Sequence, residues 1–482
     1  MEQRLADMSK TRKTLFHSLI GISILLTGIA HADAVQNQIA EQAAAIERGQ
    51  ITNIEGIRLT APDFLTELYA LREYQPLWRA REQSEELIRE LFDARRHGFR
   101  PEDFSLNALL ASRNAADTGN PAAQAKFDIA ATEAAARLLH HVYFGKVDPV
   151  SLDPNWSLEG VFMPAIPAAM VNQYLELATL GALVDNVEIT HPGYRRLQNA
   201  LDRYMTIDSN GGWPEVPEGT SLRVGQEDER IPALKRRLAI TGDYAGDDYD
   251  TSNFEGALLA AVQNFQTRHG LEADGLIGPK TFRALNRTVP ERIDQLRASL
   301  ERARWLFRDL GEYYVFVNIG GPETYLVQNG EMVWRARSIV GQAYRQTPIF
   351  RDTIQYMEFN PTWTVPVSIF LKDKLPLIRR DPNYLKRGGY TVLDSEGRLI
   401  NPSLVNWAGS PRVTLRQEPG SKNALGQVKF MFPNIHSVYL HDTDDRSLFN
   451  RNERNLSSGC VRIENPFELA DLLMKDDPNW SA

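Results

Sequence analysis

The sequence predicts a multidomain α+β protein in which helical domains precede a mostly β C-terminal domain. Its 482 residues are enough for two to four domains, at about 100 to 200 residues per domain. Apolar residues recur at spacings of three and four before residue 311 and at spacings of two after it, which indicates helices followed by strands. Hydrophobic residues at 43% and charged residues at 24% are typical of folded chains and exclude a disordered or collagen-like protein.

The charge balance and the cysteine content argue against several further classes of protein. Lys and Arg number 54 against 62 Asp and Glu, a net charge of −8, which argues against nucleic acid as a partner because phosphate binding needs clustered cations. The single cysteine, Cys460, permits neither an intramolecular disulfide nor a multi-cysteine zinc site. The adjacent His140 and His141 face different ways on a helix, and no nucleotide fingerprint occurs, so we expect no metal site and no cofactor.

Residues 1–32 have the pattern of a signal peptide. Three basic residues within 10–13 precede an apolar run over 15–29, and a small-x-small sequence follows at 30–32. The run is shorter than the roughly 20 residues that a membrane span needs. We therefore predict an exported protein, with an uncleaved membrane anchor as the alternative.

Residues 33–222 are predicted to form a helical domain. Apolar residues at spacings of three and four lead up to Leu91 and continue through the Ala-rich stretch 121–143 and through 194–204. Breaks rich in Pro and Gly separate these stretches. We find no chemical motif in this domain.

Residues 223–289 are predicted to form a compact unit of three short helices, and an amphipathic helix over 290–311 connects this unit to the C-terminal domain. Pro279 suits the first position of the third short helix, and Asp274-Gly275 suits a turn. The string FQTRHGLEADGLIGPKTFRALN, residues 265–286, resembles the peptidoglycan-binding module of cell-wall enzymes in its FQ, HGL, DG, IG, T and AL positions.

Residues 312–482 are predicted to form the mostly β domain. Its closing helix covers 466–474 and begins with a capping box of Asn465 and Glu468. The Asn329-Gly330 dipeptide predicts a tight hairpin turn. The predicted strands cover residues 313–319, 324–328, 331–340, 353–360, 428–432 and 435–441.

A long insert, at about 366–425, interrupts these strands. It is irregular and basic, with Lys372, Arg379, Lys386 and Arg398 among its cations. Inserts of this length in a compact domain are usually functional lids or disordered segments. Its place between the strands favours a lid, and a solvated loop is the alternative.

Cys460 lies in a pattern that suits a catalytic thiol. A thiol needs a base, and His441 lies upstream at the end of a predicted strand. Gly459 permits a tight turn in which the backbone N–H groups of Gly459 and Cys460 face a developing oxyanion. Arg462 adds a positive charge that could favour the thiolate or hold a substrate carboxylate.

The pattern of His441 followed by Ser458-Gly459-Cys460 and Arg462 resembles the catalytic signature of the L,D-transpeptidases, the YkuD-type domain. The strings VGQAYRQTPIF, FNPTWTVP and YLHDT are similar to the large Gram-negative members, which have a helical scaffold domain, a peptidoglycan-binding module and a substrate lid. The resemblance implies that Cys460 is the nucleophile and His441 the base. Many members have His where this chain has Ser458, so the role of that position stays open.

We predict supporting roles for several residues near Cys460 and His441 in the sequence. Arg462, Ser458 and Tyr439 of the YLHDT string are candidates for substrate binding. The side chain of Asp442 should point away from His441, and the resemblance implies that the Asp442 backbone carbonyl orients the imidazole. We place His436 on a strand, facing away from His441, as a structural or solvent-facing residue.

The resemblance implies a periplasmic enzyme of cell-wall biogenesis and cell shape. It would form 3-3 cross-links between peptidoglycan stem peptides, through a Cys460 thioester on a tetrapeptide donor, releasing the terminal D-alanine. Diaminopimelate of a second stem is the expected acceptor, although a lipoprotein lysine, a free D-amino acid or water stays open. Carbapenem-type β-lactams are expected inhibitors, and other cell-wall synthesis enzymes are expected partners.

Two other classes of protein remain as alternatives to a transpeptidase. One is a cysteine hydrolase of wall peptides, a carboxypeptidase or an endopeptidase, but papain-like enzymes place Cys before His in the chain. Sortases have the order His, Cys, Arg, but with a wider gap and no wall-binding module of this type. The other class is a non-catalytic peptidoglycan-binding scaffold, which the presence of both Cys460 and His441 disfavours.

Overall fold

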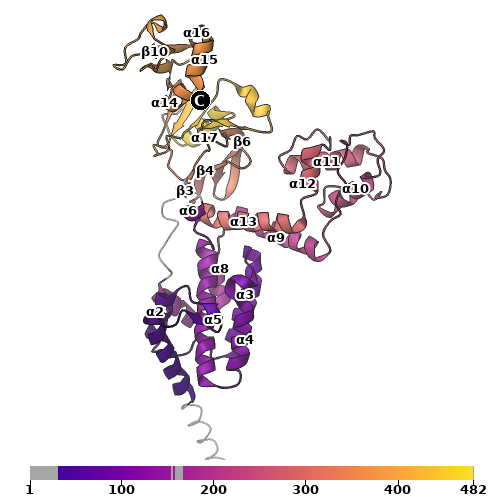
Figure 1. Ribbon diagram of the computed structural model, residues 1–482, viewed down its shortest axis with the longest axis vertical. Coiled ribbons are helices and arrows are strands. Elements are labelled where there is room, and N and C mark those ends of the chain that lie inside the picture. The colour runs from indigo at the N-terminus through magenta and orange to yellow at the C-terminus, as the bar shows by residue number, and fades with distance from the viewer. Residues whose placement is uncertain (1–30, 153–155, 158–166, 178, 481–482) are drawn as a thin grey trace, which may run out of the picture. The chain divides into compact units, whose positions relative to one another are not determined.

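The computed structural model describes residues 31–152, 156–157, 167–177 and 179–480 (Figure 1). A helical N-terminal region precedes a domain rich in β-strands, which confirms the predicted fold class. The predicted signal peptide lies, except for its last two residues, outside the described residues. No helix in the described ranges is long and apolar enough to cross a membrane.

The described chain divides into two compact units. The first unit consists of helices from the N-terminal region together with one later helix, α13. Its elements are β1 (Asn53–Ile54), β2 (Ile57–Arg58), α2 (Pro62–Leu71), α3 (Arg81–Asp93), η1 (Ala94–His97), η2 (Pro101–Phe104), α4 (Leu106–Ala116), α5 (Pro121–Phe144), α7 (Ala168–Leu177), α8 (Leu180–Val187), α9 (Pro192–Ser209) and α13 (Val289–Phe307), after a helix over 31–47. The long helix α5 is the centre of its core, because Ile129, Ala130 and Leu138 are fully buried.

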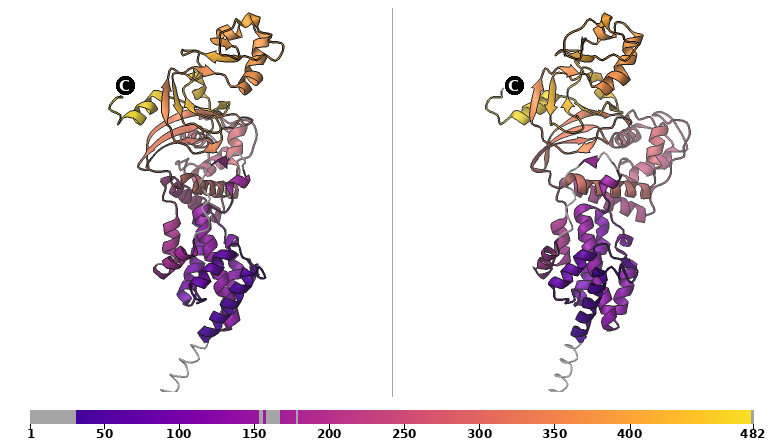
Figure 2. Two further views of the ribbon diagram at one scale, coloured as in Figure 1. Left: turned by 90° about the vertical axis from the view of Figure 1, so that its left-hand side faces the viewer. Right: turned by 60° about the vertical axis from the view of Figure 1, so that its left-hand side comes forward.

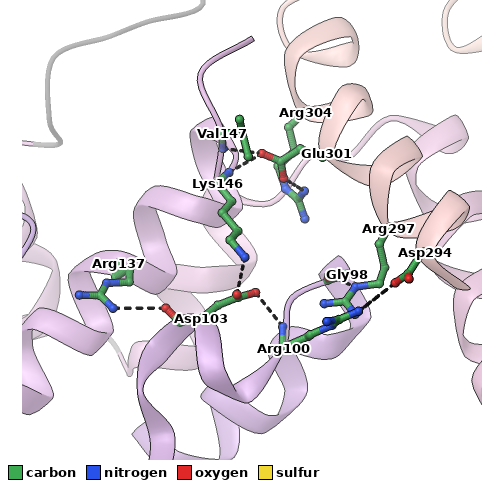
Figure 3. A network of polar contacts seen from close by, with 10 residues as sticks. All are labelled: Gly98, Arg100, Asp103, Arg137, Lys146, Val147, Asp294, Arg297, Glu301 and Arg304. Atoms are coloured by element: carbon green, nitrogen blue, oxygen red, sulfur yellow. Dashed lines mark hydrogen bonds and ion pairs between the residues drawn. The ribbon is translucent and has the colours of Figure 1, made fainter. Parts of the chain in front are cut away.

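Helix α13, which we predicted as a connector, is part of the first unit. It packs along α9, and Tyr194, Leu201 and Leu300 are buried between them (Figure 1). Polar side chains of α13 also satisfy backbone groups at the ends of other helices, as Figure 3 shows. Arg297 donates to the carbonyl of Gly98 at 2.7 Å, and Glu301 accepts from the backbone N–H of Val147 at 2.9 Å.

The packing of α9 against α13 explains how residues 213–287 are connected to the helical domain. The helices before and after them, α9 and α13, lie side by side in the first unit, so the segment between is an insertion in the helical domain. The insertion has a core of its own, with Leu234, Phe265 and Phe282 buried. Its helices are α10 (Ile231–Ile240), α11 (Gly256–Arg268) and α12 (Pro279–Leu285).

The core of this insertion reaches beyond the predicted start at residue 223. Val216 is buried, and Asn286 holds it by accepting from its N–H at 2.9 Å and donating to its carbonyl at 2.8 Å. The predicted turn at Asp274-Gly275 is present. Gly275 has φ +73°, a backbone conformation that side-chain-bearing residues rarely adopt, so the turn favours glycine.

The second unit contains the β domain. Its large sheet has the strand order β4-β5-β6-β15-β13-β12-β8, with β14 paired to β6. The bounds are β4 (Tyr313–Asn318), β5 (Glu323–Gln328), β6 (Glu331–Gly341), β8 (Tyr356–Phe359), β12 (Val428–Met431), β13 (Leu440–His441), β14 (Asn455–Ser457) and β15 (Val461–Ile463), with η5 (Arg446–Asn450) and the closing helix α17 (Pro466–Met474). Two short elements, α6 (Pro149–Leu152) and β3 (Trp156–Ser157), also belong to this unit, and β3 pairs with β7 (Ile349–Phe350).

The hairpin β5–β6 turns at Asn329-Gly330 as predicted. Both residues have positive φ, +53° and +79°, as a two-residue turn of this kind requires. The predicted capping box of α17 is wrong. Asn465 has φ +55° and makes no side-chain cap, while Glu468 accepts a hydrogen bond from the Trp334 indole at 3.0 Å instead.

Two predicted strands are shorter than expected. Strand β8 covers only part of 353–360, and β13 contains only the last two residues of 435–441. The side chain of Asn434 accounts for the second difference. Its Oδ1 accepts from the N–H groups of His436 and Val438, and its Nδ2 donates to the Val438 carbonyl at 2.7 Å, which folds the backbone into a turn.

The insert at 366–425 is a folded subdomain, whereas we predicted an irregular segment. Figures 1 and 2 show its elements gathered in one lobe beside the large sheet. Apolar residues between its basic ones form a separate core that includes Phe370, Ile378 and Leu415. The elements are β9 (Trp363–Thr364), α14 (Val367–Ile369), the π-helical turn η3 (Phe370–Lys374), α15 (Leu375–Arg380), α16 (Tyr384–Arg387), β10 (Tyr390–Leu393), η4 (Pro402–Leu404) and β11 (Thr414–Gln417), with sheet order β10-β11-β9. Strand β9 directly precedes the insert and pairs with β11 inside it. We call residues 366–425 the lid insert.

Candidate active site

The parallel pairing of β13 and β15 places His441 opposite Arg462, and Cys460 lies directly before β15. Leu440 pairs with Val461, and both side chains point into the core. Side chains alternate along a strand, so the residues on either side of this pair point to the opposite face. His441 and Arg462 therefore share that face, and Tyr439 and Cys460, which directly precede the two strands, interact with each other. We call this side of the sheet the thiol face.

The turn that carries Cys460 is held by residues far away in the sequence. Gly459 has φ +122°, a backbone conformation that favours glycine. Thr347 donates to the Gly459 carbonyl at 2.8 Å and accepts from the Gly341 N–H at 2.9 Å. A Cβ at Gly341 would lie 2.2 Å from the Arg345 carbonyl, so the loop after β6 can reach the turn only with glycine there.

One of the two predicted oxyanion donors, the backbone N–H of Gly459, already donates a hydrogen bond within the protein. The Gly459 N–H donates to Ser457 Oγ at 3.1 Å, and the same hydroxyl donates to the Cys460 carbonyl at 2.6 Å. The Gly459 N–H could therefore serve an oxyanion only after the Ser457 hydroxyl turns away. The role of the Gly459 and Cys460 backbone stays a prediction.

The electrostatics favour a neutral thiol beside a neutral imidazole. Burial lowers the pKa of His441 to about 3, and the positive charge of Arg462 contributes to this shift. Burial also raises the pKa of the Cys460 thiol, while the backbone and hydroxyl of Tyr439 act in the opposite direction. The imidazole of His441 is therefore unprotonated at neutral pH, and the thiol keeps its proton until it reacts.

The carboxylate of Asp442 is not bonded to the imidazole. It is buried, and it accepts hydrogen bonds from the Gln427 N–H at 3.0 Å and from Arg446 at 3.3 Å. The Nδ1 atom of His441 is buried without a hydrogen bond of ordinary geometry in the described part of the chain, while backbone groups of Asp442 and Leu425 lie close enough to the imidazole to act on its pKa, in the raising direction. Orientation of the imidazole by the Asp442 backbone therefore stays a prediction.

The three residues proposed for substrate binding lie around the thiol. The Arg462 guanidinium donates to Thr443 Oγ1 at 3.3 Å, and burial lowers its pKa. The ring of Tyr439 lies against His441, with centroids 5.5 Å apart. Ser458 Oγ accepts a hydrogen bond from Arg345 at 2.9 Å, so this hydroxyl faces the loop after β6.

His436 lies in the turn before β13, not on a strand, so our reason for its orientation is wrong. Its ring packs against Phe350, with centroids 5.2 Å apart. The carbonyl of the next residue, Ser437, lies 3.8 Å from the sulfur of Cys460. The turn therefore contributes a backbone carbonyl to the surroundings of the thiol.

Sequence reasoning missed the ion pair between Arg345 and Asp373. Arg345 forms a two-pronged contact with the Asp373 carboxylate, one N···O distance being 2.8 Å, while it also bonds Ser458. Arg345 therefore links the lid insert to the turn that carries Cys460. The available signal was an acidic residue between two bases, Lys372 and Lys374, in a basic insert.

We expect loss of this link to loosen the lid insert. Arg345→Ala and Asp373→Asn should each change the ratio of aminolysis to hydrolysis of a Cys460 thioester, toward hydrolysis, by about three- to tenfold. Product ratios measured by mass test this. The double variant should change the ratio no more than either single variant, because the two residues act as a pair.

The matched control is Arg398→Ala, which removes an exposed ion pair with Asp394 elsewhere in the lid insert. It should leave the product ratio unchanged. Equal effects of Arg398→Ala and Arg345→Ala would contradict a specific link, because general loss of charge from the insert would then explain both.

Comparison with known families agrees with this architecture. Residues 312–479 match the YkuD family, described as "L,D-transpeptidase catalytic domain". Residues 63–201 match "Scaffold domain", and residues 227–285 match "Putative peptidoglycan binding domain". The chain therefore contains a catalytic domain of the L,D-transpeptidase family, with a scaffold domain and a peptidoglycan-binding domain, as the sequence motifs predicted.

One curated protein and one solved structure that are similar to this chain are named as L,D-transpeptidases. A curated Haemophilus influenzae protein, "Putative L,D-transpeptidase", is 37% identical over 227 residues, 45% of this chain and 46% of that protein. The chain thus spans about half the length of this relative. A crystal structure of the L,D-transpeptidase from Xylanimonas cellulosilytica is 17% identical and covers 54% of this chain and 93% of that one. Its TM-score of 0.16 is too low to support an argument about the site.

No group of three or more His, Cys, Asp or Glu side chains in the described residues could hold a metal ion. The adjacent histidines of α5 pack against aromatic rings, His141 on Phe99 and Phe104 and His140 on Phe144. His141 is partly buried among these rings, whereas His140 is exposed.

Proposed function

We propose that this chain is a periplasmic L,D-transpeptidase that forms 3-3 cross-links between peptidoglycan stem peptides. The observation that carries the proposal is that His441 ends β13 and Cys460 directly precedes its partner strand β15, in a region that matches this family. The thiol face also carries Arg462, a cation suited to an anionic peptide.

The first half-reaction is acylation of Cys460. Its sulfur attacks the carbonyl carbon of the L-centre of the third stem residue, and His441 takes the thiol proton. The amide C–N bond then breaks, and the nitrogen of the departing D-alanine takes the proton from the imidazolium. His441 is unprotonated at neutral pH, so its lone pair is available. A pKa of about 3 makes the resting imidazole a weak base, so proton transfer must accompany the attack of the sulfur rather than precede it.

The second half-reaction transfers the acyl group. The amine of a diaminopimelate on another stem attacks the thioester carbon and gives a proton to His441, and the sulfur leaves and regains a proton. One amide is exchanged for another, so no nucleotide is needed. The lid insert would exclude water while the amine arrives.

The proposed test is incubation of the full chain with defined tetrapeptide muropeptides, followed by identification of products by mass. We expect a thioester on the protein, free D-alanine and a dimer linked between two third residues. Release of tripeptide alone would support the hydrolase alternative, and absence of any product would overturn the proposal.

We also propose that residues 213–287 bind peptidoglycan, in support of this reaction. The family match at 227–285 and the separate core of this insertion support the proposal. Sedimentation with insoluble sacculi measures it directly.

A further inference from the structure

A cavity of about 380 Å³ lies between the lid insert and strand β15, which begins directly after Cys460. Four of its lining side chains are cationic, namely Lys374, Arg387, Lys422 and Arg462, and one, Asp444, is acidic. The chain as a whole carries a net charge of −8, so this concentration of positive charge is local. We call this space the lid cavity.

Most of this positive charge has no acidic partner. Arg387 is paired with Asp381, but within the described ranges Lys374, Lys422 and Arg462 form no ion pair. The Nε atom of Arg462 is buried and makes no hydrogen bond in the same ranges. Lys374 and Arg462 are half-buried and Lys422 is exposed, and Asp444 is the one acidic side chain in the lining. The cavity therefore has an excess of positive charge, which suits an anionic ligand.

The walls of the lid cavity are fixed by the fold of the lid insert. Gln417 is 3% exposed and donates to the carbonyls of Gly388 and Lys422, at 2.6 and 2.7 Å, which joins two sides of the cavity. The Lys374 ammonium lies 5.6 Å from the ring centroids of both Trp363 and Tyr390. These contacts hold the ammonium of Lys374 and the backbone of Lys422 in place before a ligand arrives.

The lid cavity lies within reach of a peptide bound at the thiol. Arg462 lies on β15 and follows Cys460 by two residues, a distance of about 7 Å along an extended chain. An extended peptide covers about 3.5 Å per residue. A carboxylate within two residues of the carbonyl that Cys460 attacks can therefore enter the cavity.

We infer that the lid cavity is a carboxylate-binding subsite for the stem peptide, with Lys374 and Lys422 of the lid insert and Arg462 of β15 as its cations. The inference rests on the proposed function and adds to it the part of the substrate that the lid insert recognises. The carboxylate has two possible sources: the C-terminus of the donor tetrapeptide, and the carboxylate beside the acceptor amine.

The test compares acid and amide forms of each substrate on the full chain. In the donor arm, acylation of Cys460 by a tetrapeptide and by its C-terminal carboxamide is followed by intact mass. In the acceptor arm, the Cys460 thioester is formed first and is then given an amine that bears either a carboxylate or a carboxamide. The ratio of aminolysis to hydrolysis is measured for each amine. The protein is used as wild type, Lys374→Met and Lys422→Gln, with Lys374→Arg and Lys422→Arg as variants that retain the charge.

We expect the wild type to prefer the acid form by about ten- to a hundredfold in at least one arm, the usual effect of a hydrogen bond to a charged group. Lys374→Met and Lys422→Gln should lose most of this preference, mainly through KM, and the Arg variants should keep part of it. The matched control is Lys386→Gln, an exposed lysine of the lid insert that does not line the cavity, and it should keep the full preference. Alkylation of Cys460 by iodoacetamide should proceed at the wild-type rate in all variants.

The arm in which the preference is lost identifies the source of the carboxylate. An unchanged preference in both arms, while every variant still forms the thioester, would overturn the subsite and leave the proposed function standing. Failure of the wild type to form a thioester with any stem peptide would overturn both. Should Lys374→Met not fold, the acid preference of the wild type must still fall as salt rises from low to high concentration, and a salt-independent preference would overturn the subsite.

Discussion

Cys460→Ala is expected to abolish formation of the thioester and of every cross-linked product. No other thiol exists in the chain, so no neighbouring side chain can replace the nucleophile. The loss should exceed the detection range of a mass-based product assay. The fold should persist, because the side chain removed is small and partly exposed, and the thermal unfolding midpoint should stay close to that of the wild type.

A carbapenem-type β-lactam offers a second readout of the same residue. Attack of the thiol on the strained carbonyl should give one covalent adduct on the intact protein, and digestion should place it on the peptide that contains Cys460. Cys460→Ala should form none. An adduct on another peptide, or full cross-linking by Cys460→Ala, would overturn the assignment.

His441→Ala is expected to slow acylation by about a hundredfold to ten-thousandfold, the usual contribution of a general base. The pH dependence distinguishes this role from a structural one. With the pKa of His441 lowered to about 3 and that of the Cys460 thiol raised, neither group changes protonation between about pH 5 and 8. The acylation rate of the wild type should therefore be flat over this range.

The His441→Ala profile should differ in shape as well as in magnitude. Without a base, reaction depends on the small thiolate fraction, so its rate should rise about tenfold per pH unit over the same range. Stopped acylation reactions read by intact mass give both profiles. A wild-type inflection near pH 6.5 would contradict the neutral pair, because it would show an imidazole with its ordinary pKa.

The features that could be predicted from sequence are those that depend on neighbours along the chain. Helix α17 begins at the predicted proline and ends at the predicted residue, and the Asn329-Gly330 turn has the predicted positive φ values. The three short helices of the peptidoglycan-binding domain follow their apolar spacing in the same way. Local propensity and periodicity are properties of short segments, so such elements can be derived from the order of residues.

Other features depend on single side chains that compete with those patterns. Residues 435–439 have the alternation of a strand, but Asn434 bonds the backbone on both sides of His436 and produces a turn. Asn465 and Glu468 have capping-box spacing, yet Trp334 takes the carboxylate. In both cases a specific hydrogen bond overrides a general preference worth no more than about one kcal/mol per residue.

The sequence by itself determined the candidate nucleophile and base, because a unique thiol, a glycine turn and an upstream histidine are visible as letters. Only the tertiary structure decided how α13 joins the helical unit, that the lid insert has its own core, and that Arg345 links Asp373 to Ser458. It also decided that cations from the lid insert and from β15 surround one cavity. These features join residues separated by tens to hundreds of positions, and such contacts exist only after the chain has folded and brought their partners together.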